Sequence, residues 1–134
     1  MQVYFKNNFV SMYYDKAAQV GKAVWRGRLQ GPELREAFLL CLDLIDRHGL
    51  TRWLADDRLM EAMDPADLEW SLKEFLPQLT GSLLQRMAWL PSHFVENREA
   101  VEVLIEKGHT PDHYIVHRTF YDEQEAMAWL MEPL

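Results

Sequence analysis

Cysteine is almost absent from this chain of 134 residues, which contains only Cys41. A single thiol cannot form an internal disulfide, so a disulfide-stapled secreted scaffold is excluded. Long apolar runs are also missing, because no stretch of about 18 apolar residues occurs. The first residues lack the apolar core of a signal peptide. The composition therefore predicts a cytoplasmic protein without a membrane span.

Positive charge is scarce as well. Lys and Arg number 14 against 21 Asp and Glu, which gives a formal net charge of -7. Without a basic surface, nucleic acid is not an expected partner. The chain also lacks a glycine-rich phosphate loop, a nucleophile elbow and a metal-binding motif, so we predict no enzymatic activity and no cofactor. Apolar residues are plentiful at 49%, and we expect residues 1–134 to form a single domain around one core.

The hydrophobic pattern predicts an α/β fold. Two β-rich runs, 9–14 and 20–29, are separated by a polar segment and indicate an antiparallel hairpin. Gly31-Pro32 starts a helix that His48-Gly49 ends. Three strands then follow at 53–55, 87–90 and 114–120, each with a helix after it. Strands joined by helical crossovers lie parallel, so we expect a five-stranded mixed sheet with four helices.

Local signals predict where two of these helices begin or end. Asp64 is expected to cap the second helix through its side chain, with Pro65 in the first turn. Pro77 lacks a backbone donor, so this helix should kink or end near Leu76. Asp122 and Glu125 have the spacing of a capping box before the last helix.

The element order and several short segments resemble a known family. These segments are "VWRGRL" leading into "GPELREAF", then "WLADDRLMEAMDPADLEW" and "RMAWLPS". Over residues 9–131 the chain resembles the STAS-like proteins related to anti-anti-sigma factors, in particular the small bacterial single-domain group. The resemblance implies a STAS-like fold and a regulatory role. Relatives in the superfamily bind a kinase, regulate anion transporters or, in CRAL-TRIO domains, transfer lipids.

The chain departs from the family's phosphorylation motif. Anti-anti-sigma regulators carry a D-S-S-G-like motif whose serine accepts phosphate after the third strand. This chain has Asp56-Asp57-Arg58 in the expected loop and no Ser or Thr between Thr51 and Ser71. A phosphorylation switch is therefore not expected here.

The expected loop after Trp53 carries the candidate binding residues. In parallel sheets, ligands and partners bind at the carboxyl ends of the strands. We expect one of the adjacent carboxylates to pair with Arg58 or Arg26 and to order the loop. An apolar surface beside it would include Trp70, which lies off the apolar stripe of its helix. The candidate residues for binding a partner or ligand are Asp56, Asp57, Arg58, Met60, Met63, Trp70 and His93.

Other reactive side chains have ordinary interpretations. Cys41 falls in the apolar stripe of the first helix, where a buried core thiol is the expectation. His113 and His117 share strand parity, but four residues of extended chain separate them by about 13 Å, too far to hold one metal together.

Two functions remain. We favour a non-enzymatic module that binds a protein partner through the rim from Asp56 to Trp70 and through Pro91 to His93. The alternative is a carrier of a small apolar ligand or lipid, which a continuous pocket of about 300 Å³ or more would favour. The sequence leaves open whether the domain forms a homodimer.

Overall fold

The structure is a computed structural model that describes residues 1–111 and 114–134. The described residues form a six-stranded sheet whose strands follow chain order. The strands are β1 Gln2–Lys6, β2 Val10–Asp15, β3 Val20–Gly27, β4 Arg52–Met60, β5 Arg86–Leu90 and β6 Val116–Thr119. β1, β2 and β3 pair antiparallel, whereas β3 to β6 pair in parallel. The predicted mixed α/β sheet, with an amino-terminal hairpin before parallel strands, is confirmed.

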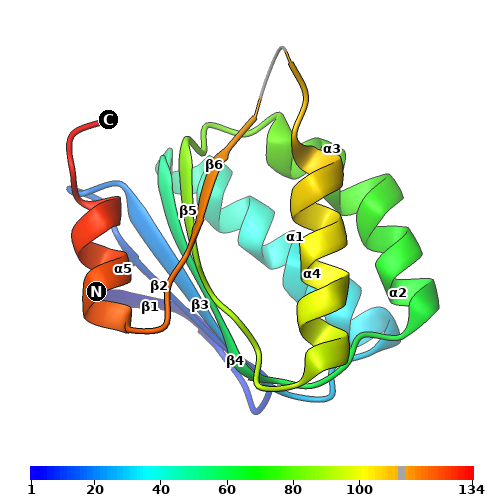
Figure 1. Cartoon of the computed structure of the whole chain (residues 1–134). Coiled ribbons are helices and arrows are strands. Elements are labelled where there is room, and N and C mark those ends of the chain that lie inside the picture. Colours follow the sequence, from blue (N-terminus) through cyan, green and yellow to red (C-terminus); the bar gives the residue numbers. More distant parts are fainter. Residues whose placement is uncertain (112–113) are drawn as a thin grey trace.

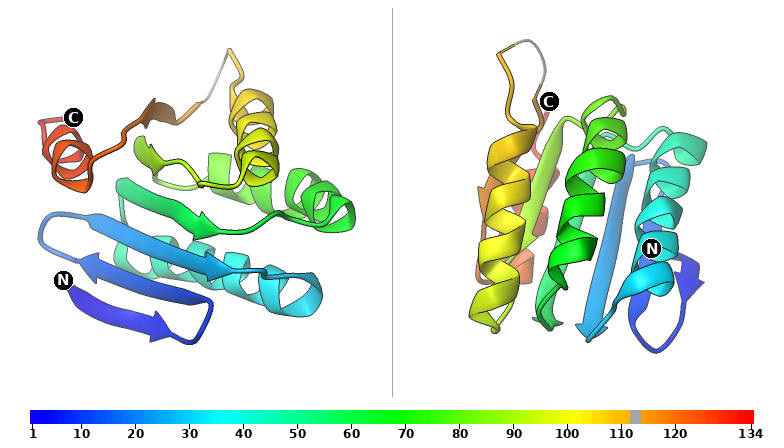
Figure 2. Two further views of the ribbon diagram at one scale, coloured as in Figure 1. Left: turned by 60° about the horizontal axis from the view of Figure 1, so that its bottom comes forward. Right: turned by 90° about the vertical axis from the view of Figure 1, so that its right-hand side faces the viewer.

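The helices cover the two faces of the sheet unequally (Figures 1 and 2). One face carries α1 Gly31–His48, a continuous helical segment and α4 Val95–Gly108. The continuous segment consists of α2 Pro65–Trp70, the π-helical η1 Ser71–Phe75 and α3 Leu76–Thr80. The other face carries α5 Glu123–Leu130. None of these described helices is both long and apolar enough to cross a membrane.

The prediction of five strands is wrong because β1 is an additional edge strand. β1 pairs with β2 through a register that includes Val3 opposite Tyr13 and an irregularity between Val3 and Phe5. All five of its residues are exposed or half-buried, so it lacks the clear alternation of a half-buried strand. An edge strand needs only one neighbour, and β2 supplies the hydrogen bonds that stabilise it.

The fourth strand is longer than predicted, and it contains the charged triplet that we expected in a loop. β4 continues through Asp56, Asp57 and Arg58 to Met60. Its register against β3 changes between the pairs Val24–Asp56 and Arg26–Leu59, which places one extra residue in β4. A bulge of this kind re-aims side chains without ending the strand.

The second helical segment differs from prediction at Asp64 and matches it only in part at Pro77. It begins at Pro65 as expected, but the Asp64 side chain makes no capping hydrogen bond and pairs with Arg28 instead. The chain stays helical beyond Leu76, but the helix is irregular at the predicted place, because π-helical η1 ends at Phe75 and α3 begins at Leu76. The π-helical turn η1 precedes Pro77, which lies in the first turn of α3, where a missing backbone donor costs little.

The last strand and the last two helices follow the predictions with small shifts. β6 covers 116–119 of the expected 114–120, and α4 follows β5 as the helix predicted after that strand. Asp122 accepts a hydrogen bond from the Glu125 backbone N–H at 3.1 Å, which is one half of the predicted capping box. His113 lies outside the described residues.

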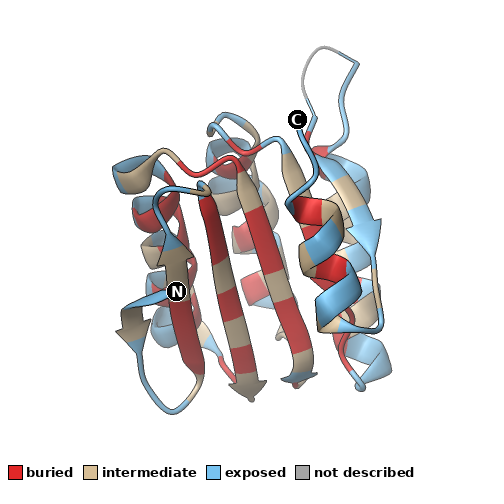
Figure 3. Cartoon of the chain, turned by 90° about the vertical axis from the view of Figure 1, so that its left-hand side faces the viewer, coloured by how far each residue is buried: buried red, intermediate tan, exposed pale blue. Residues whose placement is uncertain are grey.

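Buried side chains form one cluster on each face of the sheet. The larger cluster fills the space between the sheet and α1 to α4. The smaller one lies beneath α5 and consists of Val20, Leu54, Ala88, Leu90, Ala126 and Leu130. Figure 3 shows that α5 crosses only part of its face. The two clusters place opposite sides of β4 in different surroundings, which decides the environment of its charged triplet.

Candidate functional site

The seven predicted site residues differ widely in burial. Asp56, Asp57 and Met60 are buried, Arg58, Met63 and Trp70 are half-buried, and His93 is exposed. The main chain brings the two strand ends together, because the His93 N–H donates to the Arg58 carbonyl at 3.0 Å. The side chains do not form one exposed rim.

Asp56 lies on the face of the sheet that carries α5, and Arg58 holds it there. Arg58 donates from Nε and Nη2 to the two carboxylate oxygens at 2.9 and 2.8 Å. Arg58 also lies 3.7 Å from Glu123 of α5. Burial opposes ionisation of Asp56, but the hydrogen bonds from the side chain and backbone of Arg58 outweigh it and hold its pKa below the usual range. The expected pairing with Arg58 is confirmed, and it orders the strand.

Asp57 lies on the opposite face, beneath the helices α1 to α4. Its Oδ2 accepts a hydrogen bond from the indole Nε1–H of Trp89 at 2.9 Å. Burial raises the pKa of Asp57 to about 7, the charge of Asp56 adds to this effect, and the Trp89 hydrogen bond reduces it. A carboxyl group with a pKa this high is a candidate functional group.

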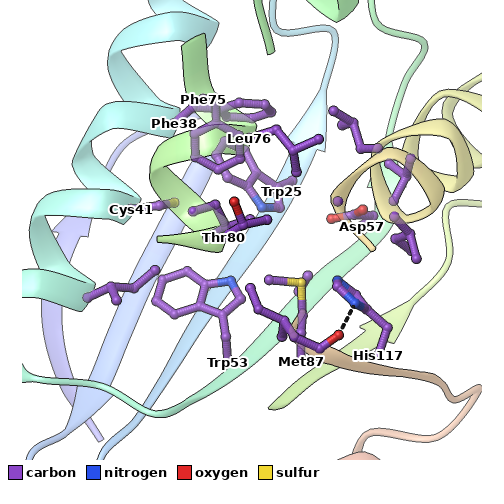
Figure 4. A pocket seen from close by; sticks show the side chains of 18 of the residues that line it. Trp25, Phe38, Cys41, Trp53, Asp57, Phe75, Leu76, Thr80, Met87 and His117 are labelled. Atoms are coloured by element: carbon purple, nitrogen blue, oxygen red, sulfur yellow. Dashed lines mark hydrogen bonds between the residues drawn. The ribbon is translucent and has the colours of Figure 1, made fainter. Parts of the chain in front are cut away.

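A cavity of about 110 Å³ lies next to Asp57, between the sheet and the helices. Figure 4 shows Phe38 and Cys41 on the side of α1, with Asp57 and His117 on the other side in that view. Most of the lining is apolar, and much of it is aromatic. The lining residues are Trp25, Phe38, Cys41, Ile45, Trp53, Ala55, Asp57, Met60, Met63, Phe75, Leu76, Leu79, Thr80, Met87, Val101, Leu104, Ile105, Gly108, Ile115 and His117.

The three predicted apolar site residues separate in the structure. Met60 and Met63 line the cavity. Trp70 instead packs against Phe38, with ring centroids 6.4 Å apart, and lies beneath the Arg35 guanidinium. Met60 is only 3% exposed. These side chains therefore do not form the exposed contact surface that the sequence suggested.

Two further titratable groups line the cavity, although the sequence did not mark them as site residues. Cys41 is buried as expected, and burial raises the pKa of its thiol above the usual range. His117 Nδ1 lies 2.9 Å from the Ile115 carbonyl oxygen. Burial lowers the pKa of His117, which favours the neutral form of its ring. The described residues include no group of three or more His, Cys, Asp or Glu side chains placed to hold a metal ion.

A surface groove between α3 and α4 adjoins the cavity. The cavity and the groove, which measures about 390 Å³, share the lining residues Leu76, Thr80 and Gly108. A Cβ atom at Gly108 would lie 3.1 Å from Leu76 Cδ1, so the two helices approach closely there.

A comparison with protein-family models, curated proteins and solved structures finds no match to the chain. The resemblance to STAS-like proteins thus stays a prediction.

Proposed function

We propose that this domain is a non-enzymatic binding protein that holds one compact, largely apolar molecule in the cavity beside β4. The observation that supports the proposal is the 110 Å³ cavity, whose wall combines four aromatic rings with the buried carboxyl of Asp57. Small-molecule sites typically combine an apolar wall with a few polar groups that fix orientation. An apolar cavity of about 150 Å³ holds benzene in another protein, and the cavity here is smaller, so we expect a ligand no larger than a small ring or a short branched chain.

The size of the cavity narrows the alternatives that the sequence left open. It is smaller than the roughly 300 Å³ of ordinary ligand pockets, so a lipid of the CRAL-TRIO type does not fit inside it. Burial of Asp57 and Met60 supports a role inside the domain for the same residues that we first assigned to a protein-binding rim.

Methionine methyl groups offer a direct test. The chain has seven methionines, and Met60, Met63 and Met87 line the cavity, whereas Met12 and Met127 do not. We expect titration with isobutanol to shift the ¹³C-methyl NMR signals of the three cavity methionines in a saturable manner. The signals of Met12 and Met127 should stay in place, since both lie away from the cavity wall.

Filling the cavity should abolish this response. Ala55 lies in the cavity wall on the central strand β4, so Ala55→Leu places added side-chain volume where the ligand would lie. Ala66→Leu makes the same change at an exposed position of α2 and is the matched control. Equal isobutanol responses in both variants, or no saturable shift in the unmodified protein, would show that the cavity is not a binding site.

A second candidate function is recognition of a protein partner, in line with the regulatory role that the STAS-like resemblance implies. The observation that favours it is a group of exposed side chains where β4 and β5 end: Leu59, His93, Phe94 and Val95. Leu59→Ser and Phe94→Ser would weaken capture of such a partner and leave the cavity methionine signals unchanged. The same variants, studied by sedimentation, would show whether this edge forms the homodimer that the sequence left open.

A further inference from the structure

The polar groups in the cavity wall include two hydrogen-bond acceptors. Trp89 donates to Oδ2 of Asp57, and Oδ1 receives no hydrogen bond from any described residue. His117 has its Nδ1 next to the Ile115 carbonyl, an arrangement in which Nδ1–H donates and Nε2 is left as an acceptor. The Thr80 hydroxyl donates its proton to the Pro77 carbonyl at 3.2 Å. A ligand that donates hydrogen bonds would complement Asp57 and His117.

Among the described residues, the cavity wall carries negative charge but no Lys or Arg. Asp57 is the acidic residue of the lining, and no Lys or Arg side chain lines the cavity in the described part of the chain. Asp56, the nearest other carboxylate, is neutralised by Arg58 on the far face of the sheet. The titratable neighbours that other elements contribute to the wall are Cys41 from α1 and His117 from β6.

Aromatic rings make up much of the remaining wall. Trp25, Phe38, Trp53 and Phe75 line the cavity from the sheet and from two helical segments. The faces of aromatic rings attract cations, and this attraction grows when the cation is removed from water. A carboxylate together with such rings is a complementary setting for an organic cation.

We propose that the ligand is a compact primary amine whose ammonium group pairs with the Asp57 carboxylate while its hydrocarbon part lies against the aromatic rings. This inference rests on the proposed function, because it specifies the ligand of the same cavity. The ammonium donates three hydrogen bonds, of which Asp57 Oδ1 accepts one, and its charge offsets that of the buried carboxylate.

The protonation of Asp57 gives the proposal a pH signature. An ammonium ion pairs with the ionised carboxyl, and the pKa of Asp57 is about 7. The carboxyl is mostly neutral at pH 6 and mostly ionised at pH 8, whereas an alkylamine is protonated at both values. Affinity for the amine should therefore rise about tenfold from pH 6 to pH 8, and affinity for a neutral alcohol should not change.

Three probes of nearly equal shape separate the ligand classes: isobutylamine, isobutanol and isobutyrate. We expect isobutylamine to bind about tenfold more tightly than isobutanol at pH 8, as measured by the shifts of the Met60, Met63 and Met87 methyl signals. Isobutyrate should bind more weakly than isobutanol, because it carries the same charge as Asp57. Asp57→Asn keeps the side-chain shape and should remove the preference for the amine while isobutanol still binds.

The outcomes distinguish this inference from the function on which it rests. If isobutanol binds and isobutylamine has no advantage at pH 8, or if the advantage survives in Asp57→Asn, the amine proposal is wrong and the cavity is a site for neutral molecules. Tighter binding of isobutyrate would also overturn it. If none of the three probes shifts the cavity methionines, the proposed binding function fails as well.

Discussion

Asp56 and Asp57 are neighbours in the chain, but their pKa values move in opposite directions. Side chains of consecutive strand residues point to opposite faces of a sheet, so the two carboxyls meet different surroundings. Asp56 receives charged hydrogen bonds from Arg58, whereas Asp57 has one neutral donor, Trp89, in an apolar region. Charged donors favour the ionised form and burial disfavours it. The two residues therefore serve different roles.

The raised pKa of Asp57 makes a prediction about stability. Between about pH 4 and pH 7 the folded state holds a proton on Asp57 that the unfolded state has released. The stability that depends on this proton is therefore fully present below about pH 4 and is lost as the pH rises to about 7. Relative to wild type, Asp57→Asn should gain stability over this window, by up to roughly 4 kcal/mol for a shift of this size. Urea unfolding of both proteins from pH 4 to pH 8 measures the difference.

Asp56→Asn is the matched control for this experiment and should show the opposite sign. The lowered pKa of Asp56 means that its ionised form stabilises the fold above the unfolded-state pKa of 3.8. Wild type should therefore exceed Asp56→Asn in stability at neutral pH and lose that advantage as the pH falls below about 4. A stability difference between wild type and Asp57→Asn that does not change with pH would contradict the assignment of the titrating group.

The partner of Asp56 could be predicted from the local sequence, but the partner of Asp57 could not. Arg58 lies two residues from Asp56, so their pairing could be expected from the triplet itself. The partner of Asp57 is Trp89, which lies 32 residues away on another strand. Cys41 and His117 join the same cavity from α1 and β6. Such convergence depends on how the elements pack, and no local pattern encodes it.

Among the elements, α1 has the clearest boundaries, and its carboxyl end depends on Gly49. This residue has φ 58° and ψ 43°, and its N–H donates toward carbonyls of the last turn. A left-handed conformation is strained for residues that have a Cβ atom. Gly49→Ala should therefore reduce the free energy of unfolding by about 1 kcal/mol, as measured by chemical denaturation.

Gly81 offers the control for that substitution. It follows α3 as Gly49 follows α1, but its φ is -82°, which any residue adopts. Gly81→Ala adds no backbone strain, and although its Cβ would lie 3.3 Å from the Pro77 carbonyl oxygen, it should cost less stability than Gly49→Ala. Equal losses at the two positions would mean that the left-handed conformation is not the source of the effect at Gly49.

Elements with strong local signals were predicted, whereas elements that depend on distant partners were not. The start of α1 at Gly31-Pro32, its end before Gly49 and the three parallel strands follow from caps and apolar runs. The length of β4 was missed because charged residues usually mark a loop, and here Trp89 accommodates one of the carboxyls across the sheet. The π turn before Pro77 was missed because proline indicates a break without revealing the alternative helical register.

At the scale of the whole molecule, two arginines attach the carboxyl-terminal segment to the sheet. Arg52 of β4 donates to the Leu130 carbonyl at 2.6 Å and to the Ala18 carbonyl at 2.9 Å. Arg86 of β5 donates to the carbonyls of Glu132 and Pro133, both at 2.8 Å. Positive charge at the carboxyl end of a helix also interacts favourably with the helix dipole. These bonds join α5 to the beginning of the parallel strands.

Removing one of these arginines should loosen α5 before it affects the rest of the fold. In Arg52→Met we expect hydrogen exchange of the amides in Glu123–Leu130 to accelerate by about tenfold or more, because the carbonyls at the end of α5 lose charged donors. Arg47→Met is the control, since Arg47 forms an exposed pair with Asp43 within α1. Acceleration spread evenly over all helices would show that Arg52 supports the whole fold rather than α5.

The agreement between strand order and chain order has a consequence for synthesis. The ribosome releases β1 first, and each later strand emerges beside a neighbour that has already left the exit tunnel. No strand has to be inserted between two others that have already paired. The β2–β3 hairpin is a local template, and β4, β5 and β6 extend it one helical crossover at a time. The wall of the cavity is completed only when α4 and β6 arrive, so in a nascent chain that stops before residue 95 the part of the wall that these two elements supply is missing.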